Sequence, residues 1–136
     1  MEMLRRSIKR HEGFSLVPYL DTEGNYTIGY GRKLKEKCAP IRVHEAEEFL
    51  TEDIYHASDN LMRWRFNHKV SLSIARSRAL IELIFWVGYT GFLRFAKMGE
   101  ALEKRDFHLA ALELYNSDIG KKHSKRTRQL AEILWG

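Results

Sequence analysis

One stretch of alternating residues constrains the fold of this 136-residue chain more than any other feature. Residues 26–31 read Tyr-Thr-Ile-Gly-Tyr-Gly, so large and small side chains alternate with the period of two that predicts a β-strand. The preceding segment 21–25, Asp-Thr-Glu-Gly-Asn, is typical of a turn, and residues 16–20 supply a partner strand. We therefore expect a small hairpin or three-stranded meander within residues 14–34.

Helical spacing dominates the rest of the chain. Residues 2–11 predict a short helix that stops at Gly13, because glycine adopts the left-handed conformation of helix ends at little cost. Residues 44–62 place apolar side chains on one face, as a long amphipathic helix does. Further helices are expected at residues 68–74, 76–87, 92–96, 99–104, 106–116 and 124–134.

Local signals add detail to these later helices. The segment 76–87 becomes apolar on nearly all sides, which predicts a helix buried at the centre of a bundle and broken by Gly88 and Gly91. Asp106 and Ser124 are expected N-caps. The buried face of the last helix is expected to carry Thr127, Leu130, Ala131 and Leu134.

Together these elements predict an α+β fold in a single domain, residues 1–136. A small N-terminal lobe, about residues 1–43, holds a helix and the hairpin or meander. The helix 44–62 connects it to a larger all-helical lobe, about residues 63–136. Ligand sites often form where two lobes meet, so a cleft there is the expected position of a functional site.

Composition restricts the class of protein. An apolar fraction of 44% indicates a globular chain, and the single cysteine, Cys38, excludes an intrachain disulfide and suits a reducing cytosol. The N-terminus lacks the apolar run of a signal peptide. The longest apolar stretch, residues 83–89, is too short to cross a bilayer. We expect a soluble cytoplasmic protein without stable membrane insertion.

The net charge of +5 favours anionic partners. Residues 120–128 contain five lysines and arginines, which fits either a solvated helix start or a binding surface. No aromatic-basic RNA motif or zinc finger is present, so nucleic acid is not expected and an acidic cell-wall polymer or the outer membrane is favoured. The six histidines are scattered, which predicts neither a metal site nor a cofactor.

Three residues around the predicted turn suit hydrolysis of a glycosidic bond, which needs a proton donor and a second carboxylate. Glu12 ends the first helix, where the helix dipole disfavours a negative charge, so it suits the proton donor. Asp21 begins the turn, where neighbouring groups can solvate a carboxylate. Thr27 lies on the returning strand, where its hydroxyl can hold a water beside Asp21. Singly, each is more often an ordinary helix-end, turn or strand residue.

The spacing of these residues resembles that of a known family. Residues 12–31, EGFSLVPYLDTEGNYTIGYG, are similar to the active-site segment of phage-type lysozymes, the T-even phage endolysins and their relatives in glycoside hydrolase family 24. Their pattern, Glu, eight residues, Asp, five residues, Thr, is intact here. Similarity continues at residues 41–53, 79–91 and 126–135, so it spans most of the chain.

The resemblance implies a muramidase that cleaves the β-1,4 bond between N-acetylmuramic acid and N-acetylglucosamine in peptidoglycan. It assigns Glu12 as general acid, and Asp21 with Thr27 as the groups that position water. Phe85 matches a cleft aromatic and Lys33 a substrate-contact position. Arg126 matches an arginine that approaches the catalytic glutamate and opposes the helix-end effect.

The resemblance also implies a context. A phage or prophage endolysin without a signal sequence stays in the host cytoplasm until a holin lesion releases it to the periplasm and cell wall, and a monomer is expected. The alternative to an endolysin is an effector protein, or a larger fusion protein, that contains the same domain. The alternative function is a lysozyme-like domain that binds glycan or protein with weak or no cleavage. Inversion and retention are both left open, since the carboxyl separation decides between them.

Four departures from the family pattern fall at substrate-side positions. Arg32 replaces the histidine that commonly follows the second glycine of the strand motif, and the segment between hairpin and long helix is shorter. Glu82 and Trp86 stand where amide-bearing residues are usual, and residues 122–124 replace a Gln-Thr-Pro stretch. These changes leave the reacting residues in place and alter the binding subsites.

Overall fold

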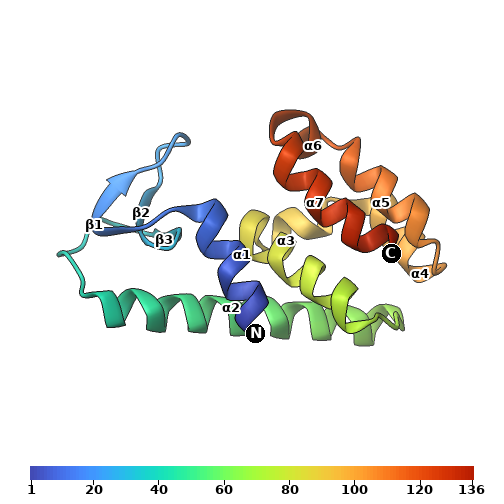
Figure 1. The fold of residues 1–136 in the computed structure, drawn as a ribbon, viewed down its shortest axis with the longest axis horizontal. Coiled ribbons are helices and arrows are strands. Elements are labelled where there is room, and N and C mark those ends of the chain that lie inside the picture. The colour runs from blue at the N-terminus through green and yellow to red at the C-terminus, as the bar shows by residue number, and fades with distance from the viewer. The chain divides into compact units, whose positions relative to one another are not determined.

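The computed structural model describes residues 1–136 as seven helices and one three-stranded antiparallel sheet, which confirms the expected lysozyme-like α+β class (Figure 1). The chain divides into two compact units, Met1–His56 and Ala57–Gly136. The elements are α1 (Glu2–Glu12), β1 (Ser15–Leu20), β2 (Tyr26–Gly29), β3 (Arg32–Leu34), α2 (Val43–His68), α3 (Ile74–Leu93), α4 (Ala96–Glu103), α5 (Phe107–Tyr115), α6 (Asp118–Lys122) and α7 (Ser124–Trp135).

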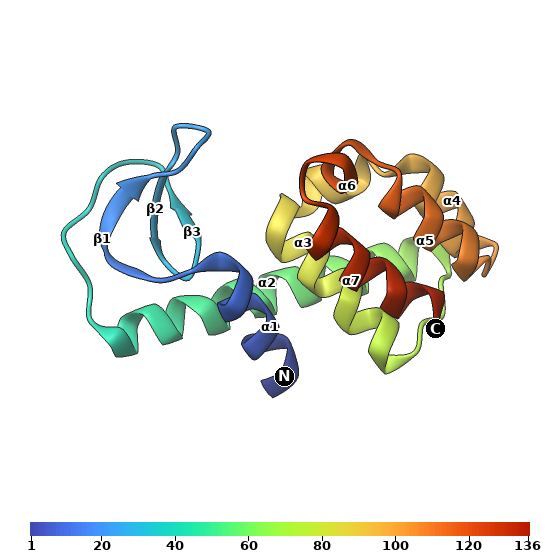
Figure 2. The same cartoon turned by 45° about the horizontal axis from the view of Figure 1, so that its top comes forward.

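The sheet of the first unit is a meander in the order β1-β2-β3, and its strands lie side by side in Figure 2. Its edge strand β1 contains Pro18, which has no N–H for a ladder bond, and its pairing with β2 is irregular between Ser15 and Tyr19. Such an irregularity is tolerated at an edge. The three-stranded alternative of the sequence prediction is therefore the one observed.

Backbone conformation at two turns requires glycine. Gly24 closes the turn between β1 and β2 with φ 82°, and its N–H donates to the Asp21 carbonyl at 3.1 Å. Gly31 lies in the tight connection from β2 to β3 with φ 85°. Residues with a Cβ rarely adopt such values, so these positions set the shape of the meander.

Helix α2 is longer than predicted, running from Val43 to His68, and the helix predicted at residues 68–74 is absent. Helix α3 begins at Ile74, where the Ser73 hydroxyl accepts the Arg76 N–H at 3.1 Å and caps the new helix. The prediction failed because this cap, and not an apolar stripe, sets the boundary.

The predicted break at Gly88 is confirmed, because helix α3 is kinked there, whereas Gly91 lies within the helical segment that follows. Gly88 takes the non-helical angles φ 79° and ψ 163°, and the helix resumes beyond it to Leu93. The predicted helices at 92–96 and 99–104 are replaced by the end of α3 and by α4. Gly99 lies inside α4, where an added Cβ would meet the Trp64 ring at the ordinary van der Waals distance of 3.6 Å, so packing does not require glycine there.

The second unit is an all-helical bundle with α3 at its core. The α3 residues Leu80 and Leu83 have no measurable exposure, in agreement with the predicted central helix. Asp106 caps α5 as predicted, with its carboxylate accepting the Leu109 N–H at 3.1 Å. The buried face of α7 is also confirmed, comprising Thr127, Leu130, Ala131 and Leu134.

Two features near the C-terminus differ from prediction. Ser124 is the first residue of α7 and not its cap; His123 occupies the cap position without a capping side-chain bond. The five-residue helix α6 was missed, because it has too few residues for a periodic signal. Its start is fixed by Ser117, whose hydroxyl accepts the Gly120 N–H at 3.3 Å.

Gly120 of α6 sits against the end of α5. A Cβ at this position would lie 2.0 Å from the Tyr115 carbonyl oxygen and 3.0 Å from that of Leu114. Because both atoms are backbone, Gly120→Ala is expected to lower the free energy of unfolding by about 2–3 kcal/mol. Urea denaturation followed by circular dichroism measures this, with Gly99→Ala as the control that meets only a side chain. Equal stability of Gly120→Ala and wild type would contradict the packing.

No single helix of the chain has both the length and the apolar composition of a membrane span. Helices α3 and α4 together have the length and apolar composition of a span, but a 99° bend separates them.

Candidate active site

Glu12 is the last residue of α1, and its carboxylate lies over Gly31 of the β2–β3 connection. A Cβ added at residue 31 would lie 2.7 Å from Glu12 Oε2 and 3.1 Å from Cδ. After Glu12 the chain turns at Gly13 with φ 73° and enters β1. The helix end thus presents this carboxylate to the sheet, and the absence of a side chain at residue 31 provides the space.

Helix α1 is held in place by one carboxylate of α2. Glu47 accepts hydrogen bonds from Arg5, from Lys9 Nζ at 2.7 Å and from the Tyr30 hydroxyl at 3.1 Å. Arg5 also donates to the Thr51 hydroxyl at 2.6 Å. The hydrogen bond from Lys9 is the largest cause that lowers the pKa of Glu47. Because Tyr30 directly precedes Gly31, the Glu47 carboxylate links α1 to the β2–β3 connection that lies beneath Glu12.

Asp21 begins the β1–β2 turn and is held by the backbone of that turn. Its Oδ1 accepts the N–H of Asn25 at 2.8 Å and of Glu23 at 2.9 Å. The Asn25 N–H is the largest cause that lowers the pKa of Asp21, followed by the Glu23 N–H and the charge of Lys33. The carboxylate is therefore ionised at neutral pH, as its predicted role requires.

Thr27 is buried, with 4% of its surface exposed. Its hydroxyl donates to the Asn25 carbonyl at 3.1 Å, and the same carbonyl accepts the Asp21 N–H at 2.9 Å. One carbonyl group thus connects the two predicted site residues. With its proton engaged, the Thr27 hydroxyl presents lone pairs and can accept a hydrogen bond from a water.

Strand register places Thr27 in the middle of a row across the sheet. Tyr19 of β1 is its partner on one side and Lys33 of β3 its partner on the other, so the three side chains share a face. Lys33 Nζ lies 4.0 Å from Asp21 Oδ2 and 3.9 Å from Glu23 Oε2. The structure therefore brings the predicted Asp21, Thr27 and Lys33 together.

Tyr19 lies within electrostatic reach of both predicted catalytic carboxylates. Burial raises the pKa of the Tyr19 hydroxyl, and the negative charges of Glu12 and Asp21 raise it further. The phenol is accordingly a neutral hydrogen-bond donor. Tyr19 was not predicted as a site residue; the signal that identifies it is its position two residues before Asp21, which sets it on the same side of an extended strand.

Arg32 anchors β3 to the first part of α2. Its Nε and Nη2 donate to Asp53 at 3.1 and 2.8 Å, and its guanidinium lies 4.1 Å from the centroid of the Phe49 ring. Arg32, which stands where the family commonly has a histidine, therefore has a structural role, because a carboxylate and an aromatic ring hold its planar guanidinium group.

The remaining predicted residues belong to the second unit. Phe85 is partly buried and packs against the bundle core. The guanidinium of Arg126 lies 4.1 Å from the centroid of the Trp86 ring, and Trp86 contacts the His123 ring edge-on at 5.5 Å. Their functional roles stay predictions.

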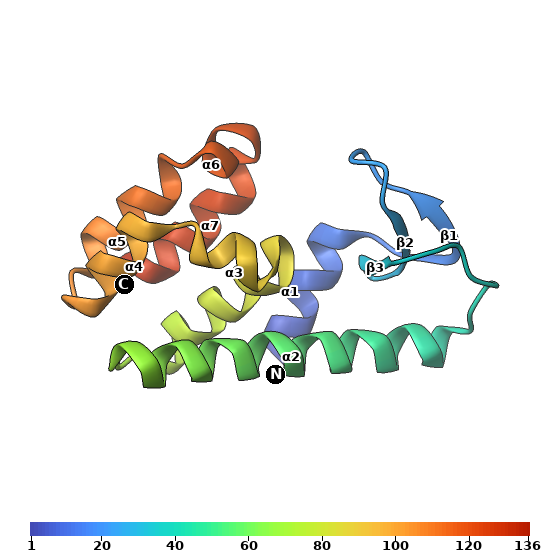
Figure 3. The same ribbon diagram turned by 180° about the vertical axis from the view of Figure 1, so that it is seen from behind.

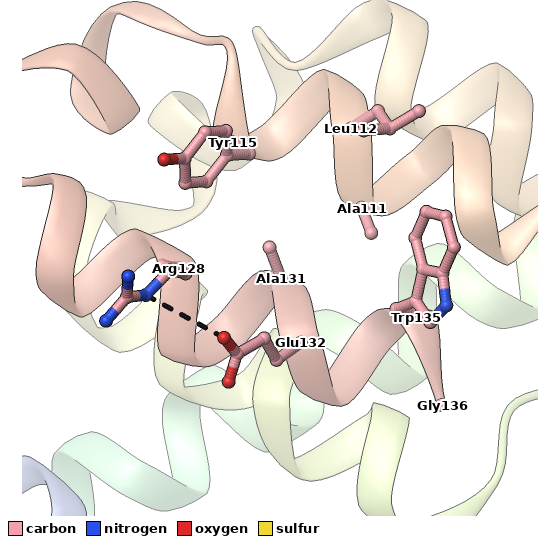
Figure 4. Close-up of a pocket in the computed structure, with 8 residues that line it drawn as sticks. All are labelled: Ala111, Leu112, Tyr115, Arg128, Ala131, Glu132, Trp135 and Gly136. Atoms are coloured by element: carbon pink, nitrogen blue, oxygen red, sulfur yellow. Dashed lines mark ion pairs between the residues drawn. The ribbon is translucent and has the colours of Figure 1, made fainter.

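A cavity of about 320 Å³ lies between α5 and α7 and contains none of the predicted site residues. Figure 4 shows Ala111 and Ala131 facing each other across it, with Tyr115 and Trp135 at its margins. Its lining is mostly apolar. No three His, Cys, Asp or Glu side chains are gathered as metal ligands in the chain.

Comparison with protein families matches residues 9–131 to the phage lysozyme family. The chain belongs to that family. The matched range includes Glu12, the whole sheet and the first eight of the twelve residues of α7. Membership of the phage lysozyme family supports a muramidase-like function and a glycoside hydrolase chemistry.

Two curated relatives are named as probable T4-type lysozymes. The chain is 27% identical over 156 residues to probable T4-type lysozyme 2 of Dictyostelium discoideum and 24% identical over 160 residues to probable T4-type lysozyme 1 of that organism. Each alignment covers 96% of this chain and 92% of the relative. These phage lysozyme relatives are distant in sequence, and the similarity extends over the whole fold.

The lowered pKa of Asp21 predicts the titration of this carboxyl. Its ionised form favours the folded state above a pH of about 4, and this contribution is lost as the pH falls through the lower folded value. We expect the Asp21 Cγ resonance, followed by ¹³C NMR, to titrate with a pKa below that of an unperturbed aspartate. In Lys33→Ala the pKa should rise, because one positive charge is lost. A wild-type pKa at or above the unperturbed value would contradict the observed hydrogen bonding.

Proposed function

We propose that this phage lysozyme family member is a muramidase that hydrolyses the β-1,4 bond between N-acetylmuramic acid and N-acetylglucosamine in peptidoglycan. The observation that supports it best is a pair of carboxylates in unlike environments, Glu12 at a helix end over Gly31 and Asp21 in a hydrogen-bonded turn. Glycoside hydrolysis uses such a pair with unlike environments.

In the proposed mechanism Glu12 donates a proton to the oxygen of the leaving sugar. Asp21 acts from the other face of the sugar ring. Because its Oδ1 is occupied by two backbone N–H groups, Oδ2 is the oxygen that receives the proton of the attacking water. The Thr27 hydroxyl accepts the second hydrogen bond of that water. Asp21 with a lowered pKa is a weak base, which suits attack on an oxocarbenium-like centre.

Lys33 and Tyr19 border the same strand row and are proposed to contact the substrate on the sheet side. Lys33 reduces the repulsion between Asp21 and Glu23 and can donate to a sugar or peptide oxygen. Phe85 is proposed as a further substrate contact and Arg126 as a partner of the catalytic glutamate. Peptidoglycan is the proposed partner, reached from the host cytoplasm through a holin lesion.

A binding domain with weak or no cleavage is the second candidate. It is favoured by the substrate-side changes, since Arg32 is engaged with Asp53 and Trp86 with Arg126. Such a domain would retain affinity for glycan chains without releasing products.

Product analysis on purified peptidoglycan distinguishes these functions. The muramidase is expected to release fragments with new reducing N-acetylmuramic acid ends, detected by borohydride reduction and mass spectrometry. Asp21→Asn should reduce release by about 10²-fold or more. Reducing N-acetylglucosamine ends, or binding to the insoluble polymer without release, would overturn the proposal. The anomer formed first, read by NMR, distinguishes inversion from retention.

A further inference from the structure

An open hollow of about 620 Å³ in the second unit is lined by three cationic side chains, Arg65, Lys69 and Arg105. The other residues that line it, among them Phe66, Asn67 and Ser71, are uncharged. Three positive charges around one concavity repel each other, and no acidic residue in the lining compensates them. The hollow is separate from every residue of the proposed muramidase site.

Two of these cationic residues have an unusual backbone conformation. Lys69 and Arg105 are the two residues other than glycine that have a positive φ in this chain, 54° and 57°. Lys69 directly follows the last residue of α2, and Arg105 is the second residue beyond the end of α4. Helix ends in this conformation usually carry glycine, because a Cβ costs free energy there. The helix dipole favours a cation anywhere near the C-terminal end of a helix. It does not explain why a cation occupies the position at which glycine is preferred.

The surrounding bonds fix the geometry of the hollow. Arg65 Nε donates to the Val70 carbonyl at 3.3 Å, and its Nη1 donates to the Ser77 hydroxyl at 3.3 Å. His68 Nδ1 and Glu103 Oε1 lie 2.8 Å apart, and they join the ends of α2 and α4. Figures 1 and 3 show these two helix ends at the same end of the second unit. These bonds fix Arg65 and the two helix ends near which Lys69 and Arg105 lie.

We propose that this hollow binds a phosphate group. Guanidinium and ammonium groups are the usual protein ligands of phosphate, with arginine forming paired hydrogen bonds and lysine a point charge. The Asn67 amide and Ser71 hydroxyl provide further polar contacts. Phe66 is 84% exposed at the margin, so the bound group can belong to a lipid headgroup as well as to a soluble oligophosphate.

The double variant Lys69→Gly with Arg105→Gly tests this proposal. Glycine is the residue that both backbone positions prefer, so the variant should melt at or above the wild-type temperature while losing two of the three charges. Isothermal titration with sodium pyrophosphate should show saturable binding to the wild type and at least about tenfold weaker binding to the variant. Lys35→Gly with Lys37→Gly, which removes the same charge from an exposed segment, is the matched control and should bind as wild type.

A second measurement distinguishes the two sources of phosphate. Vesicles of phosphatidylcholine with phosphatidylglycerol should retain the wild type and not the double variant if the group is a headgroup; pyrophosphate binding without vesicle binding supports a soluble source. The proposal is overturned if the wild type binds neither probe, if the double variant binds like the wild type, or if the control variant loses as much affinity.

Discussion

Glu12→Gln is expected to reduce the release of peptidoglycan fragments by about 10³-fold. The amide has nearly the same shape as the carboxylic acid, and Gly31 leaves the same space for it. It cannot donate an acidic proton to the leaving oxygen, so only the proton transfer is removed. The measurement is the initial rate of fragment release from purified peptidoglycan, with turbidity loss of chloroform-treated Gram-negative cells as a second readout.

Two controls make this result specific. Glu36→Gln removes one negative charge from an exposed position and should retain the wild-type rate. The melting temperature of Glu12→Gln should stay close to that of the wild type, which excludes unfolding as the cause. A Glu12→Gln protein that cleaves within a few-fold of the wild-type rate would remove Glu12 from the role of general acid.

Gly31→Ala is expected to reduce the rate of fragment release by about 10²-fold. The new Cβ would lie 2.7 Å from Glu12 Oε2, so the Glu12 carboxylate must move. A shift of about 1 Å in a reacting group is enough for a loss of this size. The positive φ of residue 31 adds a stability cost of about 1–2 kcal/mol.

The matched control is Gly24→Ala. Gly24 has nearly the same φ, 82°, and an added Cβ there meets no atom within 4 Å. Both variants should lose similar stability by urea denaturation, and Gly31→Ala should lose far more activity. If the two variants lose activity equally, backbone strain and not displacement of Glu12 is the cause.

Local signals predicted most of the secondary structure. The period of two around Ile28 and the turn residues at 21–25 identified the sheet, because these patterns depend on the pleat and on turn chemistry alone. The cap of α5 at Asp106 was predicted for the same reason. The helix boundary near Ser73 was not predicted, because a cap decided it, and the break expected at Gly91 was wrong, because the helix continues through that residue to Leu93.

The sequence predicted that the candidate site residues of the sheet lie around one hairpin, but it did not predict their mutual contacts. Nothing in the spacing of Thr27 and Lys33 states that they are cross-strand partners, since register depends on the length of both connections. The anchoring of Arg32 on Asp53 joins residues far apart in sequence. The electrostatic influence of Glu12 and Asp21 on the Tyr19 hydroxyl likewise depends on how the fold places both carboxylates.

The shared acceptor between Asp21 and Thr27 is a main-chain group, the Asn25 carbonyl. Position 25 can therefore change its side chain during evolution while the alignment of the two residues persists. The bond from the Asn25 N–H to Asp21 excludes proline at this position, and the Asn25 side chain adds a further hydrogen bond to the Asp21 carboxylate. The link through the Asn25 carbonyl can persist between lysozymes that differ in much of their sequence, because that carbonyl is present whatever the side chain at this position.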